Sequence, residues 1–356
     1  MISELVEKCS NGLVERRTVV EAIVLAAVAG EHVLLIGPPG TAKSEAARRV
    51  ARGLGGNYFE YLLGKFSEPS ELFGPTDLRK LKDGVLETAT EGMLPEAEVA
   101  FLDEVFAGST AILNTLLTLL NERVYRRGNT RLKCPLRVCI GASNSLPEEE
   151  SLAAFADRFL VRCFLHPVSD SLLEEMLSGG REKVEFVGGG ELSTLDELSR
   201  KAGEVELGEV RPLLAQAIRQ LRHEGVNLSD RRSVRAQNLI AAAAAIAGRE
   251  KAGAEDLWAL VLAVPTEEEQ KVARRCLTEL LGESDNPALH HLAEEASAAP
   301  RVRARMLVEV AEKALAEPLD TLRVEGVLRD IDANFSEDDL PPELTEARAR
   351  LKAALS

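Results

Sequence analysis

The chain has 356 residues, a length that suggests roughly two domains and allows a sizeable core. Its formal net charge of −15 disfavours general affinity for nucleic-acid phosphates and favours protein partners. Five cysteines without a C-x-x-C pair fit a reducing compartment. The early apolar run of residues 19–30 is interrupted by Glu21, which indicates a buried helix rather than a signal or membrane segment. We therefore expect a soluble, cytoplasmic protein with no membrane insertion.

The segment of residues 37–44 carries the clearest functional pattern. An apolar run, residues 32–36, precedes it and a helix-forming run, residues 45–54, follows it, which is typical of a phosphate-binding loop between a strand and a helix. Lys43 would reach the β and γ phosphates of ATP, and the Ser44 hydroxyl would bind Mg²⁺. Ala42 stands where a glycine usually precedes the lysine, and its methyl group predicts a negative φ there. The predicted nucleotide-binding residues are Gly37, Pro38, Pro39, Gly40, Thr41, Ala42, Lys43, Ser44 and Asp103.

A second element of the predicted site is the acidic end of an apolar run. Residues 99–102 fit a strand buried on both faces, and Asp103 and Glu104 follow at once. Ligands bind at this edge of open α/β sheets. Asp103 would hold Mg²⁺ through water, and Glu104 would polarise the water that attacks the γ phosphate. Together with the loop, these carboxylates predict an enzyme that hydrolyses Mg-ATP.

Strand candidates alternate with helical patterns, which predicts an α/β fold with a mainly parallel five-stranded sheet. The candidates are residues 33–36, 57–62, 99–102, 137–142 and 160–165. A helix is expected over residues 109–122. Two hairpin insertions are expected, one in residues 77–95 with its turn at residues 82–85, and one in residues 123–137 with its tip at residues 126–129.

The second predicted hairpin is the most basic short segment of the chain. Its cations are Arg123, Arg126, Arg127, Arg131 and Lys133. A pore loop, a nucleic-acid contact and a merely solvated face are all compatible with this pattern.

Glycine clusters at residues 178–180 and 188–190 mark the predicted domain boundary. Helical patterns follow at residues 195–202, 210–223, 233–247 and 254–262, with amphipathic candidates at residues 301–316 and 343–354. We predict an ATPase core in residues 1–180, an all-α lid in residues 190–265 and a helical C-terminal extension in residues 267–356.

Several motifs resemble the MoxR branch of the AAA+ ATPases, most closely its RavA-like members, over residues 10–265. They are the runs at residues 12–16, 37–44, 73–75, 94–98, 111–117, 121–123 and 143–148. Alanine at the position of Ala42 is usual in this branch. The resemblance implies an AAA+ P-loop core with a helical lid and the use of ATP and Mg²⁺. It also places Val14 and Glu15 beside the adenine.

The resemblance also implies roles for single residues. Asn144 looks like the sensor 1 residue, which would help Glu104 to orient the attacking water. Arg158 is similar to an arginine finger that acts on the ATP of a neighbouring protomer. Arg231 is the preferred residue for the sensor 2 contact with the γ phosphate, and Arg232 is a close competitor.

For the whole protein, the resemblance implies a homo-oligomeric ring, expected to be hexameric, that remodels or activates protein clients with a VWA-domain protein. The tail lacks the length and strand pattern of the β-rich module of RavA, so partners of that module are not expected. Two alternatives stay open. A nucleic-acid motor would use the basic hairpin, although the acidic composition and the lack of interleaved aromatics make nucleic acid an unlikely partner. A nucleotide-gated scaffold would bind ATP and assemble with little turnover.

Overall fold

A parallel sheet forms the centre of the molecule. The computed structural model describes residues 2–179, 192–282 and 284–297, and beyond these residues 307–308, 310–312, 314–315, 321–335 and 340–355. The strands are β1 (Val33–Ile36), β2 (Tyr58–Leu62), β3 (Val99–Asp103), β6 (Val138–Ser143) and β7 (Val161–Phe164), in the order β2-β3-β6-β1-β7. All neighbouring pairs run parallel. The predicted α/β fold with its five-stranded sheet is confirmed, and each strand lies where a candidate was expected.

Both faces of the sheet are covered by helices. The covering helices are α1 (Ile2–Ser10), α2 (Arg17–Ala29), α3 (Lys43–Leu54), α6 (Thr110–Glu122) and α7 (Glu150–Ala156). Val33 and Leu35 face a core that includes α1, α2 and α3, whereas Leu34 and Ile36 face a second core that includes α6 and α7. Because successive strand residues point to opposite faces, burial on both sides explains the unbroken apolar runs.

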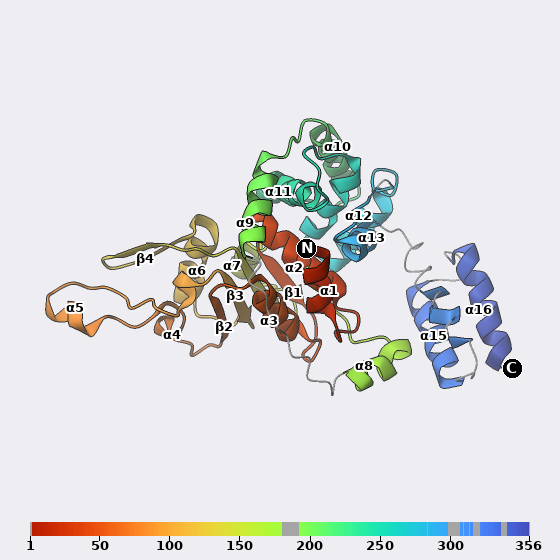
Figure 1. Ribbon diagram of the computed structural model, residues 1–356, viewed down its shortest axis with the longest axis horizontal. Coiled ribbons are helices and arrows are strands. Elements are labelled where there is room, and N and C mark those ends of the chain that lie inside the picture. Colours follow the sequence, from red (N-terminus) through yellow and green to blue (C-terminus); the bar gives the residue numbers. More distant parts are fainter. Residues whose placement is uncertain are drawn as a thin grey trace.

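A helical unit lies above the sheet in Figure 1. Its members are α9 (Leu192–Glu204), α10 (Val210–His223), α11 (Asp230–Ile246), the 3₁₀ helix η3 (Ala254–Ala263), α12 (Glu267–Cys276) and α13 (His290–Ser297). The central helix, α11, packs against α2, α9 and η3, and it buries the alanines at residues 241–245. Such small side chains let neighbouring helices approach closely. The predicted helical lid is confirmed, although its segment at residues 254–263 is 3₁₀ rather than α-helical.

The packing changes after residue 297 rather than at residue 267. Helices α12 and α13 contribute to the same core as α2 and the lid. The described residues from Leu307 onward build a separate small core. The helices of this core include α15 (Thr321–Asn334) and α16 (Pro342–Leu355).

The C-terminal unit contacts the segment that follows β7. The hydroxyl of Ser171, in η2 (Asp170–Leu172), donates a 2.6 Å hydrogen bond to Asp330 in α15. Helix α16 confirms the expected helix at residues 343–354. Most of the expected helix at residues 301–316 and the glycine cluster at residues 188–190 lie outside the described residues.

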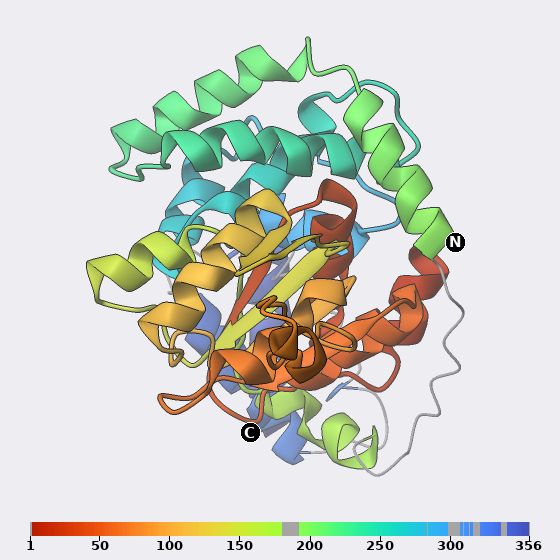
Figure 2. The same ribbon diagram turned by 90° about the vertical axis from the view of Figure 1, so that its left-hand side faces the viewer.

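Two insertions project together from the sheet, at the left of Figure 1 and toward the viewer in Figure 2. Strands β4 (Val124–Arg127) and β5 (Thr130–Lys133) form the expected antiparallel hairpin. The other insertion is not a strand hairpin, and that prediction is wrong. Its turn follows a short helix, α5 (Leu78–Lys82), because Asp77 accepts hydrogen bonds from the next backbone amides and starts a helical turn. An isolated bridge between Thr76 and Thr88 closes this loop.

Short helices complete the connections. They are α4 (Pro69–Phe73), η1 (Leu94–Glu96) and α8 (Leu173–Gly179). No helix in the described parts of the chain is both long enough and apolar enough to cross a bilayer. The five cysteines are free thiols, and burial raises the pKa of Cys9 and of Cys139 to about 12. These two thiols therefore stay protonated and act as packing residues.

Candidate nucleotide site

The loop of residues 37–44 leads from the carboxyl end of β1 into α3. Gly37 lies so close to the chain after β7 that a Cβ would be 2.3 Å from the carbonyl oxygen of Leu165. Gly40 has a φ of +81°. Only glycine fits at Gly37, and a residue with a Cβ would be strained at Gly40. Ala42 also has a positive φ, 61°, so the expected negative φ is wrong. It occupies the small left-handed region, which L-residues reach at modest cost.

The first turn of α3 offers backbone N–H donors to an anion. Its N-cap residue, Ala42, has no side chain that can accept their hydrogen bonds. The aligned peptide dipoles add positive potential at the same point. The start of α3 therefore fits a phosphate group.

Lys43 is held inside the loop. Its side chain donates hydrogen bonds to the carbonyl oxygens of Gly37, at 2.5 Å, and Pro38, at 3.0 Å. Burial lowers the pKa of Lys43, whereas the nearby carboxylates of Asp103 and Glu104 raise it. The ammonium group thus lies between the loop and the acidic end of β3, where a phosphate group would be attracted to it.

Glu104 and Asn144 meet directly after two neighbouring strands. The Asn144 amide donates a 2.9 Å hydrogen bond to the Glu104 carboxylate, and the Glu104 backbone N–H donates to Asp103 at 3.0 Å. Glu104 has a φ of 49°, a strained value for a residue with a Cβ. The next backbone N–H, of Val105, donates to Ala142 in β6 and fixes this turn. In this turn the Glu104 carboxylate lies beside the amide of Asn144.

The residues predicted to hold Mg²⁺ have suitable chemistry. Ser44 and Asp103 supply a hydroxyl and a carboxylate, the hard oxygen donors that Mg²⁺ prefers. No cluster of three or more His, Cys, Asp or Glu side chains that could hold a metal occurs among the described residues. Mg²⁺ usually keeps several waters and binds through one or two protein oxygens plus substrate phosphates, which fits this donor set.

Arg16 is a residue of the site that the sequence interpretation missed. It is 5% exposed, and its guanidinium donates to the carbonyl oxygen of Thr41 at 2.8 Å and to that of His166 at 2.6 Å. Burial lowers the pKa of Arg16, although Glu15 opposes this. Arg16 therefore ties the phosphate loop to the chain after β7. The motif of residues 12–16, which includes Arg16, was the sequence feature that could have indicated this role.

Glu15, which the resemblance places beside the adenine, makes a contact within the chain. Its carboxylate accepts hydrogen bonds from the backbone and the hydroxyl of Ser169, at 3.0 and 2.7 Å. This contact joins the segment before α2 to the segment that leads to α8.

Arg158 and Arg231 do not lie with Lys43 in this chain. Helix α7 carries the chain back from the end of β6 to the start of β7, so Arg158 lies at the opposite edge of the sheet. Ser229, the N-cap of α11, donates to Asp157 and places Arg231 near the same edge. The four residues of β7 separate this edge from the loop by about 13 Å. Nε and Nη1 of Arg158 are buried and have no hydrogen-bond partner in the part of the chain that the structure describes, and Arg231 is exposed.

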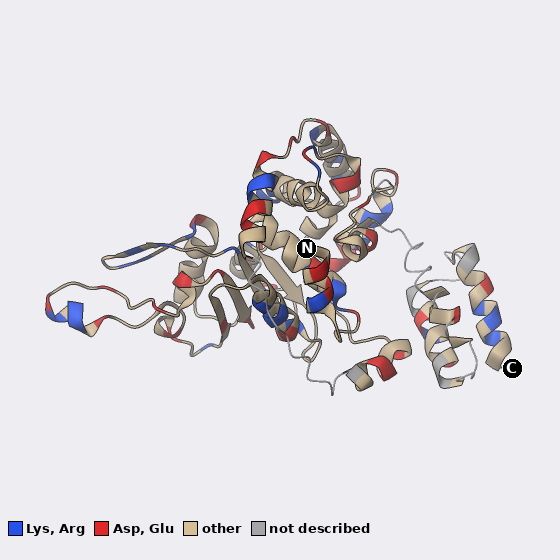
Figure 3. Ribbon diagram, viewed as in Figure 1, with Lys and Arg blue, Asp and Glu red and all other residues tan. Residues whose placement is uncertain are grey.

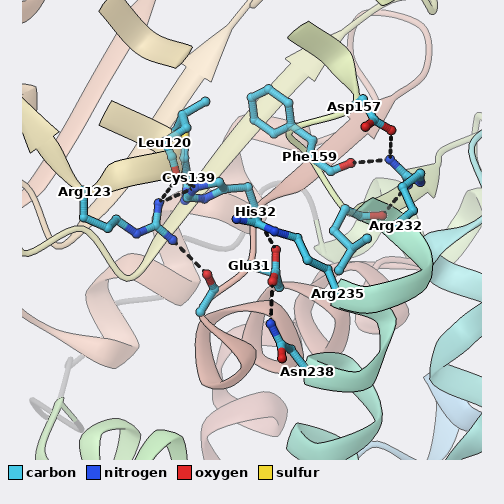
Figure 4. A network of polar contacts seen from close by, with 12 residues as sticks. Glu31, His32, Leu120, Arg123, Cys139, Asp157, Phe159, Arg232, Arg235 and Asn238 are labelled. Atoms are coloured by element: carbon cyan, nitrogen blue, oxygen red, sulfur yellow. Dashed lines mark hydrogen bonds and ion pairs between the residues drawn. The ribbon is translucent and has the colours of Figure 1, made fainter. Parts of the chain in front are cut away.

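Arg232 anchors the lid, as Figure 4 shows. Its side chain is 1% exposed and donates to the carbonyl oxygens of Leu160, at 2.6 Å, and Ala263, at 2.7 Å. It also pairs with Asp157 at 3.3 Å. Burial lowers the pKa of Arg232, and Asp157 opposes this. Because its donors are used by the protein itself, Arg232 is not available to a nucleotide, which leaves Arg231 as the exposed member of the pair.

A second polar contact joins α11 to the residues before β1 (Figure 4). Glu31 is buried and accepts hydrogen bonds from Arg235 and Asn238, both at 2.9 Å. Beside it, the Nδ1 atom of His32 accepts from the Cys139 backbone, so the ring proton is on Nε2 and is donated to the Leu120 carbonyl. The lid is thus fixed to the amino edge of the sheet at two points.

Arg123 lies against the other side of His32. It ends α6 in the left-handed region, with φ of 53°, and donates to the carbonyl oxygens of Gly30 and Leu120, each at 2.8 Å. Burial, and then the Arg123 charge, lower the pKa of His32 well below its usual value. Arg123 is therefore a structural cation at the base of the β4–β5 hairpin and not part of a solvated face.

The fold and the site define an ATPase of the AAA+ type. Residues 208–275 match the AAA lid domain, and residues 1–195 match the family described as the MoxR domain in the MoxR-vWA-beta-propeller ternary systems. The chain belongs to this MoxR family of nucleotide-binding AAA+ ATPases.

Its relatives include two uncharacterised proteins of Methanocaldococcus jannaschii. One is 35% identical over 262 residues, which cover 72% of this chain and 69% of the relative. The other is 36% identical over 257 residues, which cover 72% of this chain and 68% of the relative. A structural protein of the Acidianus two-tailed virus is 34% identical over 171 residues, which cover 46% of this chain and 27% of that protein.

Two solved structures share the fold at low sequence identity. A candidate ATPase from Cytophaga hutchinsonii has a TM-score of 0.62 at 17% identity, over 80% of this chain and 94% of that chain. A full-length MCM homolog from Methanopyrus kandleri has a TM-score of 0.53 at 16% identity, over 76% of this chain and 59% of that chain. These likenesses extend the AAA+ architecture to proteins with little sequence in common.

Proposed function

We propose that this protein hydrolyses Mg-ATP with Glu104 as the residue that activates water and Asn144 as its partner. The hydrogen bond between the two side chains carries the proposal, because it holds one carboxylate oxygen of Glu104 and leaves the other for a water molecule. Lys43 would bind the β and γ phosphates in place of its present contacts with the loop carbonyls.

Ser44 and Asp103 would hold Mg²⁺, directly and through water respectively. When bound, the ion neutralises the negative charge of the phosphates. The backbone N–H groups at the start of α3 would bind phosphate oxygens, and Arg16 would keep the loop in its binding shape through Thr41. The remaining loop residues, Gly37 to Thr41, would line the phosphates.

We further propose that catalysis takes place in a ring of identical subunits, expected to be hexameric. Arg158 and Arg231 are at the sheet edge opposite the phosphate loop of their own chain, so they would act on the ATP of a neighbour. Nε and Nη1 of Arg158 have no hydrogen-bond partner among the described residues, which leaves this half-buried cation for a neighbour's phosphates. Arg231 would contact the γ phosphate and sense its loss.

The ring would remodel or activate protein clients. The matched family takes its name from systems that combine MoxR and vWA proteins, so we propose a VWA-domain protein as a partner. From the motifs quoted above, we also propose that the chain belongs to the RavA-like branch of this family. The hinge between the sheet and the lid would transmit the state of the nucleotide through the contacts of Arg232 and Glu31.

Sedimentation of the Glu104→Gln chain tests the assembly. With Mg-ATP we expect one species of about six subunits, because the blocked base traps the ATP-bound form. Without nucleotide, or in Lys43→Ala, the chain should sediment as smaller species. A Glu104→Gln chain that binds ATP and stays monomeric at every concentration would contradict the ring.

A further inference from the structure

The two insertions pack together as one unit, which we call the arm and define as residues 74–90 and 123–134. The Thr88 backbone N–H donates to the Thr130 hydroxyl at 2.8 Å, and the Asn129 N–H donates to the Leu86 carbonyl at 2.9 Å. Nearby, the ring of Tyr125 stacks on Phe73 with centroids 5.5 Å apart. These contacts fix the β4–β5 hairpin on the first insertion, so one face of the hairpin is covered and the other is open.

The strand register shows which side chains share the open face. Arg126 is paired with Arg131, and Val124 with Lys133, so these residues point to one side. Tyr125 and Leu132 point to the other side, where Tyr125 is buried. The open face therefore carries three exposed cations, Arg126, Arg131 and Lys133.

The stability of the hairpin does not account for these cations. Arg126 and Arg131 lie directly opposite each other, and like charges in that position destabilise a strand pair. Arg126 pairs with Glu122 at 3.4 Å, whereas Arg131 and Lys133 make no ion pair with any described residue. Figure 3 shows this basic hairpin projecting from the molecule, whose net charge is −15. A ligand that brings negative charge would remove the repulsion.

We infer that the open face of β4–β5 docks an extended, acidic segment of the client protein. Arg131 and Lys133 are two residues apart on one strand, about 7 Å. Alternate side chains of an extended peptide have the same spacing, so carboxylates at every second residue match the two cations. The inference rests on the proposed function in needing a client, and it names the chemistry of that client.

Nucleic acid fits the open face less well than an acidic peptide. Single strands bind by stacking bases on aromatic rings, and the aromatic residue of the hairpin, Tyr125, is buried under the other face. Three cations neutralise few phosphates, and the negative charge of the rest of the chain repels a long polyanion.

The test compares two triple variants of the full chain. One is Arg126→Gln, Arg131→Gln and Lys133→Gln. The matched control, Lys8→Gln, Arg52→Gln and Lys352→Gln, removes the same charge from exposed positions outside the arm. Binding is measured by fluorescence anisotropy, without turnover, so its failure is distinct from failure of ATP hydrolysis. The probes are a labelled peptide of alternating Glu and Ser, its Gln counterpart, and an oligothymidine of equal charge.

We expect the wild-type chain and the control variant to bind the Glu peptide alike. The arm variant should bind it about tenfold more weakly, and the Gln peptide should bind weakly to all three chains. Equal loss in both variants would reduce the effect to net charge and overturn the inference. Tighter binding of oligothymidine, lost in the arm variant, would also overturn it, because the face would then be a nucleic-acid site. Thermal unfolding of the arm variant at the wild-type temperature excludes misfolding as the cause of lost binding.

Discussion

The amide of Asn144, after β6, lies 2.9 Å from the carboxylate of Glu104, after the neighbouring strand β3. Each residue directly follows its strand, and the two strands are neighbours, so the parallel sheet itself brings the two side chains together. One carboxylate oxygen is fixed by this contact. In the proposed mechanism, activation of the attacking water depends on this pair.

Replacing either member of the pair should slow hydrolysis without abolishing nucleotide binding. Glu104→Gln should lower kcat by a factor of about 10² to 10⁴, the usual contribution of a general base. Asn144→Ala should lower kcat less, and the double variant should be no slower than Glu104→Gln, because both act on one water. Steady-state hydrolysis and titration with a fluorescent ATP analogue measure the two effects. Glu148→Gln, an exposed carboxylate after β6, is the matched control, and undiminished turnover in Glu104→Gln would refute the choice of base.

Two inactive variants should restore each other when mixed. Lys43→Ala should lose ATP binding, because the phosphates lose their buried cation. Arg158→Ala should bind ATP and fail to hydrolyse it. In a mixed ring, a wild-type Arg158 next to an intact loop recreates a complete site, so turnover should reappear. The absence of any recovery, with mixed rings shown by mass measurement, would contradict the role of Arg158 in trans.

The adjacent arginines of α11 should give opposite results. Arg232→Ala removes a buried cation from three carbonyl groups and Asp157, and it should lower the free energy of unfolding by about 3–5 kcal/mol. Arg231 is exposed, so Arg231→Ala should change the free energy of unfolding by less than about 0.5 kcal/mol. The same substitution should lower turnover in the assembled protein. Urea unfolding and hydrolysis on the same samples measure both. A normal rate in Arg231→Ala would remove it from the site.

Acid should destabilise the folded chain through His32. Its folded-state pKa is depressed below the usual 6.5, by burial and by Arg123, so below pH 6.5 the unfolded chain binds a proton that the folded chain rejects. The free energy of unfolding should then fall by up to about 1.4 kcal/mol per pH unit as pH decreases from 6.5. Urea titrations at several pH values give the free energy of unfolding as a function of pH. This free energy should fall less steeply with decreasing pH in His32→Gln than in the wild type, and as steeply as in the wild type in the exposed control His223→Gln. Equal slopes in all three chains would show that His32 is not the titrating group.

The sheet and the position of the site were predictable because each depends on local sequence. Residues 33–36 and 99–102 are unbroken apolar runs, followed by Gly37 and by Asp103, and parallel strands bring their carboxyl ends to one edge of the sheet. The β4–β5 hairpin was likewise predictable from local sequence, through the glycine and asparagine of its turn. Periodicity likewise gave the bounds of α10.

The remaining features depend on contacts between distant residues. The role of Arg16 rests on Thr41 and His166, and the exclusion of Arg232 rests on Leu160 and Ala263, none of which lies nearby in sequence. The positive φ of Ala42 is set by the path of the whole loop. At residues 77–88 two local signals competed, and capping by Asp77 outweighed the Asp-Gly turn.

The dependence of catalysis on assembly can be measured as the rate of Mg-ATP hydrolysis per subunit against protein concentration at fixed salt. This rate should rise and then saturate as subunits assemble, because Lys43 and Arg158 of one chain belong to different sites. Sedimentation at the same concentrations should show the assembly over the same range. A constant rate that persists where the protein sediments as a monomer would contradict this dependence, since each chain would then contain a complete site.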